Sequence, residues 1–162
     1  MTNIRYPYLP EGRTIEYVPE YDKFMSAAKI LAQFESLDET MPGAAIIVLG
    51  EEIIGGGANG SSYHEEHGCE RVRLGCKTGE GYELCEGCHP KNHSEYKAIY
   101  TAQKDGIQTQ GADLYLWGHW WCCKSCWDTM ISAGIKRVFL VYESEILFNK
   151  THPHNIVGKQ FS

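Results

Sequence analysis

Two short motifs constrain this chain more than any other part of its sequence. The first is Asn92-His93-Ser94-Glu95, in which a carboxylate follows an imidazole two positions later. The second is Cys123-Lys124-Ser125-Cys126, whose two thiols have C-x-x-C spacing and begin thirty positions after His93. His93, Cys123 and Cys126 are therefore candidate ligands of a tetrahedral zinc ion, with the fourth position left for water. An open fourth position is typical of a catalytic zinc, because four protein ligands close a structural zinc.

Both motifs fall where helices are predicted to begin. The sequence pattern predicts helices over 93–104, with Asn92 as the cap, and over 123–133. Cys123 and Cys126 would then lie one helical turn apart on the same face. The positive end of the helix dipole favours the thiolate form, which is the form that binds metal.

Glu95 is the candidate proton shuttle of this site. A neutral imidazole and two thiolates cancel the charge of Zn²⁺, so a bound water is less acidic than in an all-histidine site and needs a base nearby. Each feature alone has a simpler interpretation: a C-x-x-C redox pair, a capping or core histidine, or a solvated acid in the first helical turn. Their occurrence together at helix starts favours the metal site.

The hydrophobic pattern elsewhere predicts a sheet between layers of helices. Residues 1–20 are expected to form an irregular N-terminal arm, and 143–162 a C-terminal extension in which Ile146, Leu147 and Phe148 pack back. The predicted strands cover 44–50, 53–57, 112–117 and 138–142, and glycines 55, 56 and 57 allow a neighbour or a ligand to approach closely. A further helix is predicted over 21–37, with an apolar stripe of Phe24, Ala27, Ala28, Leu31 and Phe34. In the helix over 93–104 the residues expected to face inward are Tyr96, Ile99 and Tyr100.

A second cluster of cysteines lies in the stretch 63–90, which has no convincing periodicity and is long for an irregular segment of a compact domain. All seven cysteines fall between Cys69 and Cys126, and five histidines fall between His64 and Cys126, which favours metal binding in a reducing cytosol over a secreted disulfide framework. The alternative is a set of free buried thiols. The candidate ligands are Cys69, Cys85 and Cys88, with His64 or Cys76 as a fourth that spacing does not decide.

Composition limits the possible partners and location. The net charge of −6 argues against broad binding to nucleic acid, which relies on a basic surface. No apolar run is long enough to cross a bilayer, and the N-terminus lacks the apolar core of a signal peptide. A cytoplasmic protein without a membrane partner is therefore expected.

The chain resembles the cytidine and deoxycytidylate deaminase superfamily, and most closely its dCMP deaminase branch. The resemblance covers roughly 22–142 and is most specific at the metal motifs, which follow the H-x-E and P-C-x-x-C pattern of zinc deaminases with Cys122 at the proline position. The matching segments also include the helix start Phe24-Met25-x-x-Ala28, the loop 58–60 and the run 131–138.

This resemblance implies a single α/β domain over 1–162, with a three-layer α/β/α arrangement and a mixed five-stranded sheet. It implies hydrolytic loss of ammonia at C4 of a cytosine ring, converting dCMP to dUMP, with Glu95 shuttling protons. Asn59 would reach the sugar, and the backbone at Ser94 would meet the base. A second, structural zinc would brace the insertion at 63–90. Relatives also assemble, often as hexamers, so a homo-oligomer is expected.

The segment Trp117-Gly118-His119-Trp120-Trp121 departs from the family by being bulkier and longer. Trp121 is the candidate wall of a base pocket, although any one of these tryptophans can equally fill the core. The departure leaves other substrates open: a nucleoside, single-stranded nucleic acid, guanine or a pterin-like ring. A non-catalytic, zinc-stabilised binding domain is a further alternative, which the free carboxylate of Glu95 argues against.

Overall fold

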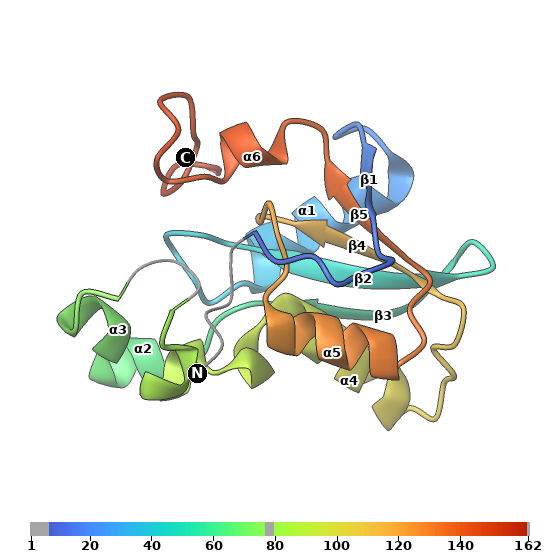
Figure 1. Cartoon of the computed structure of the whole chain (residues 1–162), viewed down its shortest axis with the longest axis horizontal. Coiled ribbons are helices and arrows are strands. Elements are labelled where there is room, and N and C mark those ends of the chain that lie inside the picture. Colours follow the sequence, from blue (N-terminus) through green and yellow to red (C-terminus); the bar gives the residue numbers. More distant parts are fainter. Residues whose placement is uncertain (1–6, 77–79, 162) are drawn as a thin grey trace.

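A mixed five-stranded sheet forms the centre of the computed structural model, which describes residues 7–76 and 80–161 (Figure 1). Its strand order is β1-β5-β4-β2-β3. β2 is antiparallel to both of its neighbours, whereas β4, β5 and β1 run parallel. The strands are β1 (Ile15–Val18), β2 (Ala44–Leu49), β3 (Glu52–Ala58), β4 (Asp113–Trp117) and β5 (Arg137–Val141). The predicted α/β class with a mixed five-stranded sheet is confirmed.

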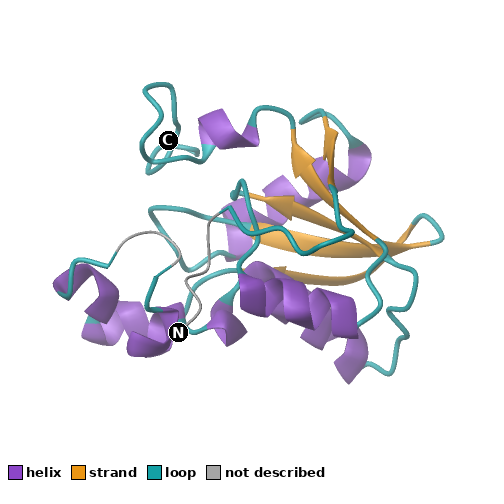
Figure 2. Cartoon of the chain, in the orientation of Figure 1, coloured by secondary structure: helices purple, strands orange, loops and turns teal. Residues whose placement is uncertain are grey.

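Helices cover both faces of the sheet (Figure 2). One face carries α4 (Ser94–Lys104) and α5 (Lys124–Ser132), and the other carries α1 (Lys23–Glu35) and the short α6 (Ser144–Leu147). The side chains of β4 alternate between the two cores: Leu114 and Leu116 pack under α4 and α5, and Tyr115 and Trp117 pack under α1. Phe148 is buried against Trp117, with ring centroids 5.2 Å apart, as expected for the C-terminal extension.

Close packing of α4 on β3 depends on glycine. A Cβ at Gly57 would lie 2.5 Å from the Cβ of Lys97, and one at Gly55 would lie 2.7 Å from the carbonyl oxygen of Ala98. The predicted close approach to these glycines is therefore made by a neighbouring helix. This contact fixes the position of α4, whose first turn carries Glu95.

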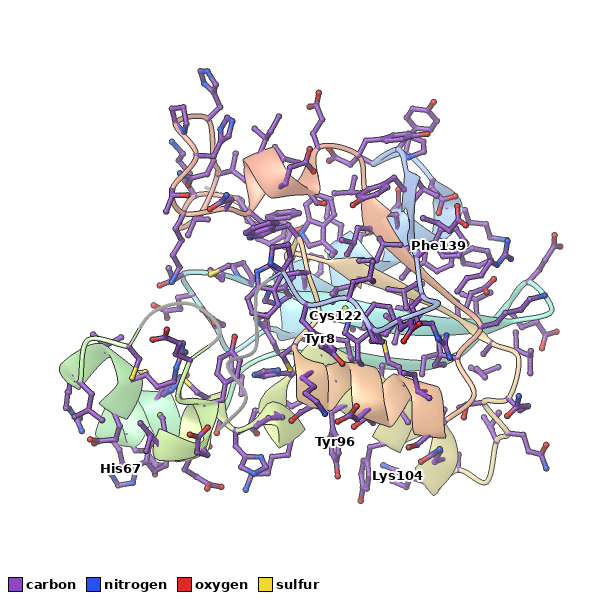
Figure 3. All side chains as sticks on the ribbon, viewed as in Figure 1. Tyr8, His67, Tyr96, Lys104, Cys122 and Phe139 are labelled. Atoms are coloured by element: carbon purple, nitrogen blue, oxygen red, sulfur yellow. The ribbon has the colours of Figure 1, made fainter. Side chains whose placement is uncertain are left out.

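The same close contact explains an error in the predicted inward face of α4. Tyr96 and Tyr100 are 38% and 58% exposed, and Figure 3 shows Tyr96 pointing away from the sheet. Ala98 and Ala102 are buried together with Ile99, because only small side chains fit above a glycine-rich strand.

Two further expectations differ from the structure. Residues 15–18 of the predicted irregular arm form the edge strand β1, which pairs with β5. This strand is too short to show a periodic pattern in the sequence. Residues 1–6 of the arm lie outside the described residues. In α1 the buried residues are Met25, Ala28 and Ala32, whereas Phe34 is 76% exposed, so the inward face is rotated from the predicted stripe.

The segment between β3 and α4 consists of short helical turns, drawn at the lower left of Figure 1. They are α2 (Tyr63–His67), α3 (Glu70–Arg73) and three 3₁₀ turns, Tyr82–Leu84, Glu86–Cys88 and Pro90–Asn92. Within the described ranges of the chain, no helix is both long and apolar enough to span a bilayer.

Candidate active site and neighbouring metal cluster

The first candidate metal site lies where α4 and α5 begin. His93 is the N-cap residue of α4, and Cys123 is the N-cap residue of α5. The Nδ1 of His93 lies 3.5 Å from the Sγ of Cys123 and 3.4 Å from the Sγ of Cys126. Bond lengths of about 2.1 Å to nitrogen and 2.3 Å to sulfur, at tetrahedral angles, separate these atoms by about 3.5 Å. The donor atoms therefore have the spacing that zinc requires.

The two thiols of this site differ in their proton affinity. A hydrogen bond with Cys126 lowers the pKa of the Cys123 thiol, burial opposes this, and His93 lowers it further, to about 5. The same hydrogen bond and burial raise the pKa of Cys126 well above its ordinary value. Cys123 is thus a thiolate that accepts a hydrogen bond from the protonated thiol of Cys126, and a bound metal ion would displace the Cys126 proton.

Glu95 is buried in the first turn of α4, with 4% of its surface exposed. The thiol of Cys122, which is fully buried just before α5, interacts with this carboxylate. Burial, and then the charge of Glu95, raises the pKa of Cys122 well above its ordinary value, so this thiol keeps its proton. The sequence marked Cys122 only as a departure from proline and did not indicate this contact.

His119 is a second residue near the site that the sequence did not single out. Its ring packs against Gly43, where a Cβ would lie 2.9 Å from Nε2. Burial, and then the neighbouring His93, lowers the pKa of His119 to about 4, so the ring is neutral near pH 7. The Trp117–Trp121 segment, noted for its bulk, was the only sequence signal that pointed to this position.

The three residues expected to contact the substrate, Ser94, Trp121 and Asn59, lie in different surroundings. Ser94 is buried beside the metal ligands, and its hydroxyl has no hydrogen-bond partner in the described part of the chain. Trp121 is half-buried against the core under α4 and α5. The side chain of Asn59 accepts a hydrogen bond from Gly43 N (2.9 Å) and donates one to Met41 O (2.9 Å), so it holds the turn that leads into β2.

A second cluster of candidate ligands forms in the segment before α4. The Nε2 of His64 lies 3.3 Å from Cys85 Sγ and 3.5 Å from Cys88 Sγ, and Cys69 Sγ lies 3.6 Å from Cys88 Sγ. The structure therefore brings His64 to the three thiols. Cys76 is not among the grouped donor atoms in the described residues. A set of one histidine and three cysteines is typical of a structural zinc site, in which four protein ligands complete the coordination.

The surroundings of the second cluster act in opposite directions on two of its thiols: burial raises the pKa of Cys88 to about 12, although Arg71 opposes this, whereas the pKa of Cys85 is lowered. Burial opposes ionisation of Cys85, but hydrogen bonds from the Glu70 backbone, from His64 and from two further backbone groups lower its pKa to about 6. The guanidinium of Arg71 lies 3.6 Å from Cys88 Sγ. Three thiolates, a neutral imidazole and Zn²⁺ carry a net charge of −1, which Arg71 partly compensates.

Asn92 does not cap α4 as predicted. Its side-chain amide donates instead to the carbonyl oxygens of Glu86 (2.8 Å) and Gly87 (3.3 Å), and the backbone carbonyl of Asn92 accepts from Gly60 N (3.1 Å). The residue therefore ties the second cluster to the loop after β3, and capping by Asn92 is wrong.

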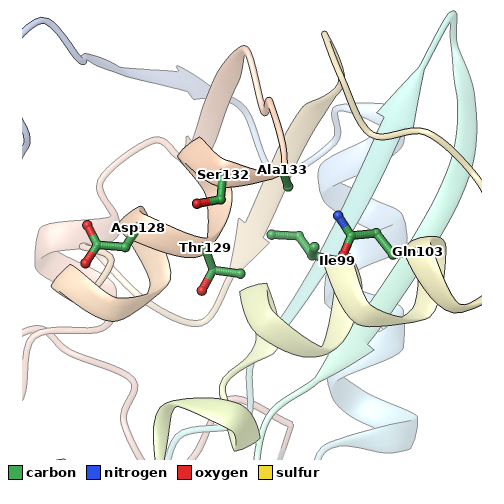
Figure 4. Close-up of a pocket in the computed structure, with 6 residues that line it drawn as sticks. All are labelled: Ile99, Gln103, Asp128, Thr129, Ser132 and Ala133. Atoms are coloured by element: carbon green, nitrogen blue, oxygen red, sulfur yellow. The ribbon is translucent and has the colours of Figure 1, made fainter.

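A surface pocket lies between α4 and α5, away from this site (Figure 4). Its lining residues include Gln103 and Ser132 in the last turns of the two helices. Because the metal ligands lie at the first turns of these helices, the pocket is not part of the metal site.

Comparison with known proteins agrees with the site. The model of the cytidine and deoxycytidylate deaminase zinc-binding region matches residues 19–142. The chain therefore belongs to this family of zinc-type deaminases. ComE operon protein 2 of Bacillus subtilis (strain 168) is 31% identical over 131 residues, which cover 81% of this chain and 61% of that protein. The chain thus spans less than two thirds of that relative's length.

Two solved structures of dCMP deaminase from the cyanophage S-TIM5 are similar in fold. The complex with dCMP and dUMP aligns with a TM-score of 0.53 and 23% identity, covering 75% of this chain and 82% of that chain. The apo form aligns over the same shares with a TM-score of 0.50 and 21% identity. These similarities support the cytidine-deaminase-like fold.

Proposed function

We propose that this chain is a zinc-dependent hydrolase that removes the amino group of cytosine in a free nucleotide, converting dCMP to dUMP with release of ammonia. The observation that carries this proposal is a buried, unligated carboxylate, Glu95, beside an incomplete tetrahedral set of His93, Cys123 and Cys126. A purely structural zinc site would need a fourth protein ligand and no free carboxylate.

In this proposal His93, Cys123 and Cys126 hold the zinc ion, which when bound acidifies a water molecule for attack on the ring. Glu95 accepts the proton of the water and delivers protons to the ring nitrogen and to the departing amine. The thiol of Cys122 donates to the carboxylate and so orients it. Burial of Glu95 excludes bulk water from the proton path.

Base and sugar recognition is assigned to Ser94, Trp121 and Asn59. The backbone at Ser94 would meet the base, Trp121 would wall its pocket, and Asn59 would reach the sugar. Asn59 keeps one amide hydrogen beyond its hydrogen bond to Met41 O, which is the group available for that contact.

The second cluster is proposed to hold a structural zinc through His64, Cys69, Cys85 and Cys88, which makes two zinc ions per chain. Its donor spacing fits that role. We further propose a single cytoplasmic domain over 1–162, with a zinc-braced insertion at 63–90, that assembles as a homo-oligomer such as a hexamer. The net charge of −6 supports a small nucleotide over a polynucleotide as the substrate.

The test is ammonia release from the zinc-loaded protein with dCMP, CMP, deoxycytidine, cytidine and guanine as separate substrates. We expect the highest kcat/KM with dCMP. Turnover of guanine alone would move the proposal to another base, and no turnover of any cytosine compound would contradict it. A gel shift with single-stranded DNA tests the polynucleotide alternative, and we expect no binding at physiological salt.

A further inference from the structure

We infer that Cys88 couples the two metal sites: its thiolate binds the second metal, and its backbone carbonyl holds His93 ready for the first. This inference rests on the two zinc sites proposed above. It makes Cys88 a positioning residue for the catalytic metal.

The orientation of the His93 ring carries the first step. Nδ1 faces the thiols of Cys123 and Cys126, while Nε2 lies 3.2 Å from the carbonyl oxygen of Cys88. Because a carbonyl oxygen can only accept, Nε2 must carry a proton, and in the neutral ring that binds a metal Nδ1 then presents its lone pair to the metal. The Cys88 carbonyl therefore selects both the tautomer and the rotation of the metal-binding ring.

The second step concerns what holds that carbonyl in place. The Sγ of Cys88 lies 3.5 Å from His64 Nε2 and 3.6 Å from Cys69 Sγ, so Cys88 is at the centre of the second cluster. Its amide also donates to Cys85 O at 3.1 Å. A metal bound to these side chains would restrain the backbone of residue 88, in addition to the hydrogen bond from its amide to Cys85 O.

Tyr82 adds a second contact from the same segment. Its ring meets the ring of His93 edge-on, with centroids 4.9 Å apart and planes at 83°. The guanidinium of Arg71 stacks over Tyr82 at 4.4 Å and also contacts Cys88 Sγ. The segment that carries the second cluster thus makes one hydrogen bond and one aromatic contact with the His93 ring.

The consequence is a linkage between the two metal affinities. Residues 80–92 contain only short 3₁₀ turns and pair with no strand of the sheet, so metal coordination would add a strong constraint to their side-chain contacts. Loss of the second metal frees the Cys88 carbonyl and lets the His93 ring rotate. By reciprocity, loss of the first metal weakens the second by the same factor.

The test compares Cys69→Ser, which removes a ligand of the second metal far from His93 in sequence, with Cys76→Ser as a matched control outside the cluster. Zinc affinity of the first site is measured by competition with a chromophoric chelator. We expect it to fall about 10–100-fold in Cys69→Ser and to stay unchanged in Cys76→Ser. An unchanged affinity in Cys69→Ser would overturn the inference.

A spectroscopic readout separates positioning from a general loss of stability. In ¹⁵N NMR of the histidine rings, we expect the Nε2–H signal of His93 to be protected from solvent exchange in Cys76→Ser and to exchange rapidly in Cys69→Ser. Equal protection in the two variants would overturn the inference. If Cys69→Ser does not fold, the reciprocal variant Cys123→Ser decides: an undiminished zinc affinity of the second site contradicts the linkage.

Turnover is measured separately, so the two proposals can fail independently. Coupled metal affinities in a protein that turns over no cytosine compound would refute the proposed reaction alone. Full dCMP turnover with independent metal affinities would refute the linkage alone.

Discussion

Glu95 and Cys122 form a buried pair beside the candidate metal ligands. Burial keeps the Cys122 thiol protonated beside the carboxylate of Glu95, and in the proposed reaction this contact would orient the proton shuttle. A proline at this position, as in the family signature, has no hydrogen to donate.

Cysteine reactivity tests the ligand assignment residue by residue. Cys76 lies outside both groups of donor atoms, whereas the other six cysteines are proposed ligands or fully buried. In the zinc-loaded native protein we expect iodoacetamide to alkylate Cys76 and to spare the rest. After chelation, Cys69 should become reactive too. Protection of Cys76 with rapid alkylation of Cys69 would contradict the assignment of the second cluster.

His119 makes stability depend on pH. Burial holds its folded pKa at about 4, below its ordinary 6.5, so an acidic solution protonates the unfolded chain first. The free energy of unfolding should therefore be unaffected by His119 above pH 6.5 and should fall by up to about 3 kcal/mol as pH drops to 4.

Urea unfolding at pH 7 and pH 5, at equal zinc loading, measures this effect. His119→Gln should lose less stability between these pH values than the wild-type protein does. Identical losses in the two proteins would show that His119 titrates normally.

At the residue scale, the sequence indicated which side chains lie together but not which backbone groups contact them. Metal ligands come from few residue types at short spacings, so His93 and the C-x-x-C pair could be found in the sequence. Every residue has a carbonyl, so nothing marked that of Cys88. Spacing also could not choose between His64 and Cys76, because only the folded path of the segment before α4 brings one of them near the thiols.

At the scale of elements, the contact of α4 with β3 determines where the first turn of α4 lies. Gly57 faces Lys97 and Ala98 at distances that leave no room for a methyl group, whereas Gly56 faces the flexible end of Leu31 at 3.2 Å on the other side of the sheet. Alanine substitutions at these two adjacent glycines therefore form a matched pair: one disturbs the contact with α4, and the other does not.

Gly57→Ala should push α4 away from the sheet and lower the free energy of unfolding by about 1–3 kcal/mol. It should also weaken zinc binding at the first site, because His93 and Glu95 move with the helix. Gly56→Ala should cost less than about 1 kcal/mol and leave zinc binding unchanged. Chemical denaturation and metal content of the two variants check this, and equal effects would mean that α4 does not position the site.

For the long segments, the hydrophobic pattern predicted whether each one is a helix or a strand. It did not predict which faces of α1 and α4 are buried. Large apolar residues mark a buried face only when the opposing surface has room for them. Against glycine strands the buried positions are alanines, and Tyr100 is left exposed. The four residues of β1 carry too little pattern to identify a strand.

At the scale of the molecule, the sheet brings together motifs that lie far apart in the chain. α4 follows the segment after β3, and α5 connects the parallel strands β4 and β5. Both helices pack on the same face of the sheet, and their first turns converge on one point (Figure 1). The second cluster lies beside that point and reaches it through Cys88. The fold class could be predicted from the motifs and the resemblance, whereas this connection between the clusters required the structure.

The most direct test of the account is steady-state ammonia release from dCMP by Glu95→Gln, at a zinc content matched to the wild-type protein. Glutamine keeps the size of the side chain and cannot take up the proton of the water. We expect kcat to fall at least about 100-fold, while zinc per chain stays the same. A zinc-loaded Glu95→Gln protein that turns over dCMP within a few-fold of the wild-type rate would contradict the assignment of Glu95 as the proton shuttle.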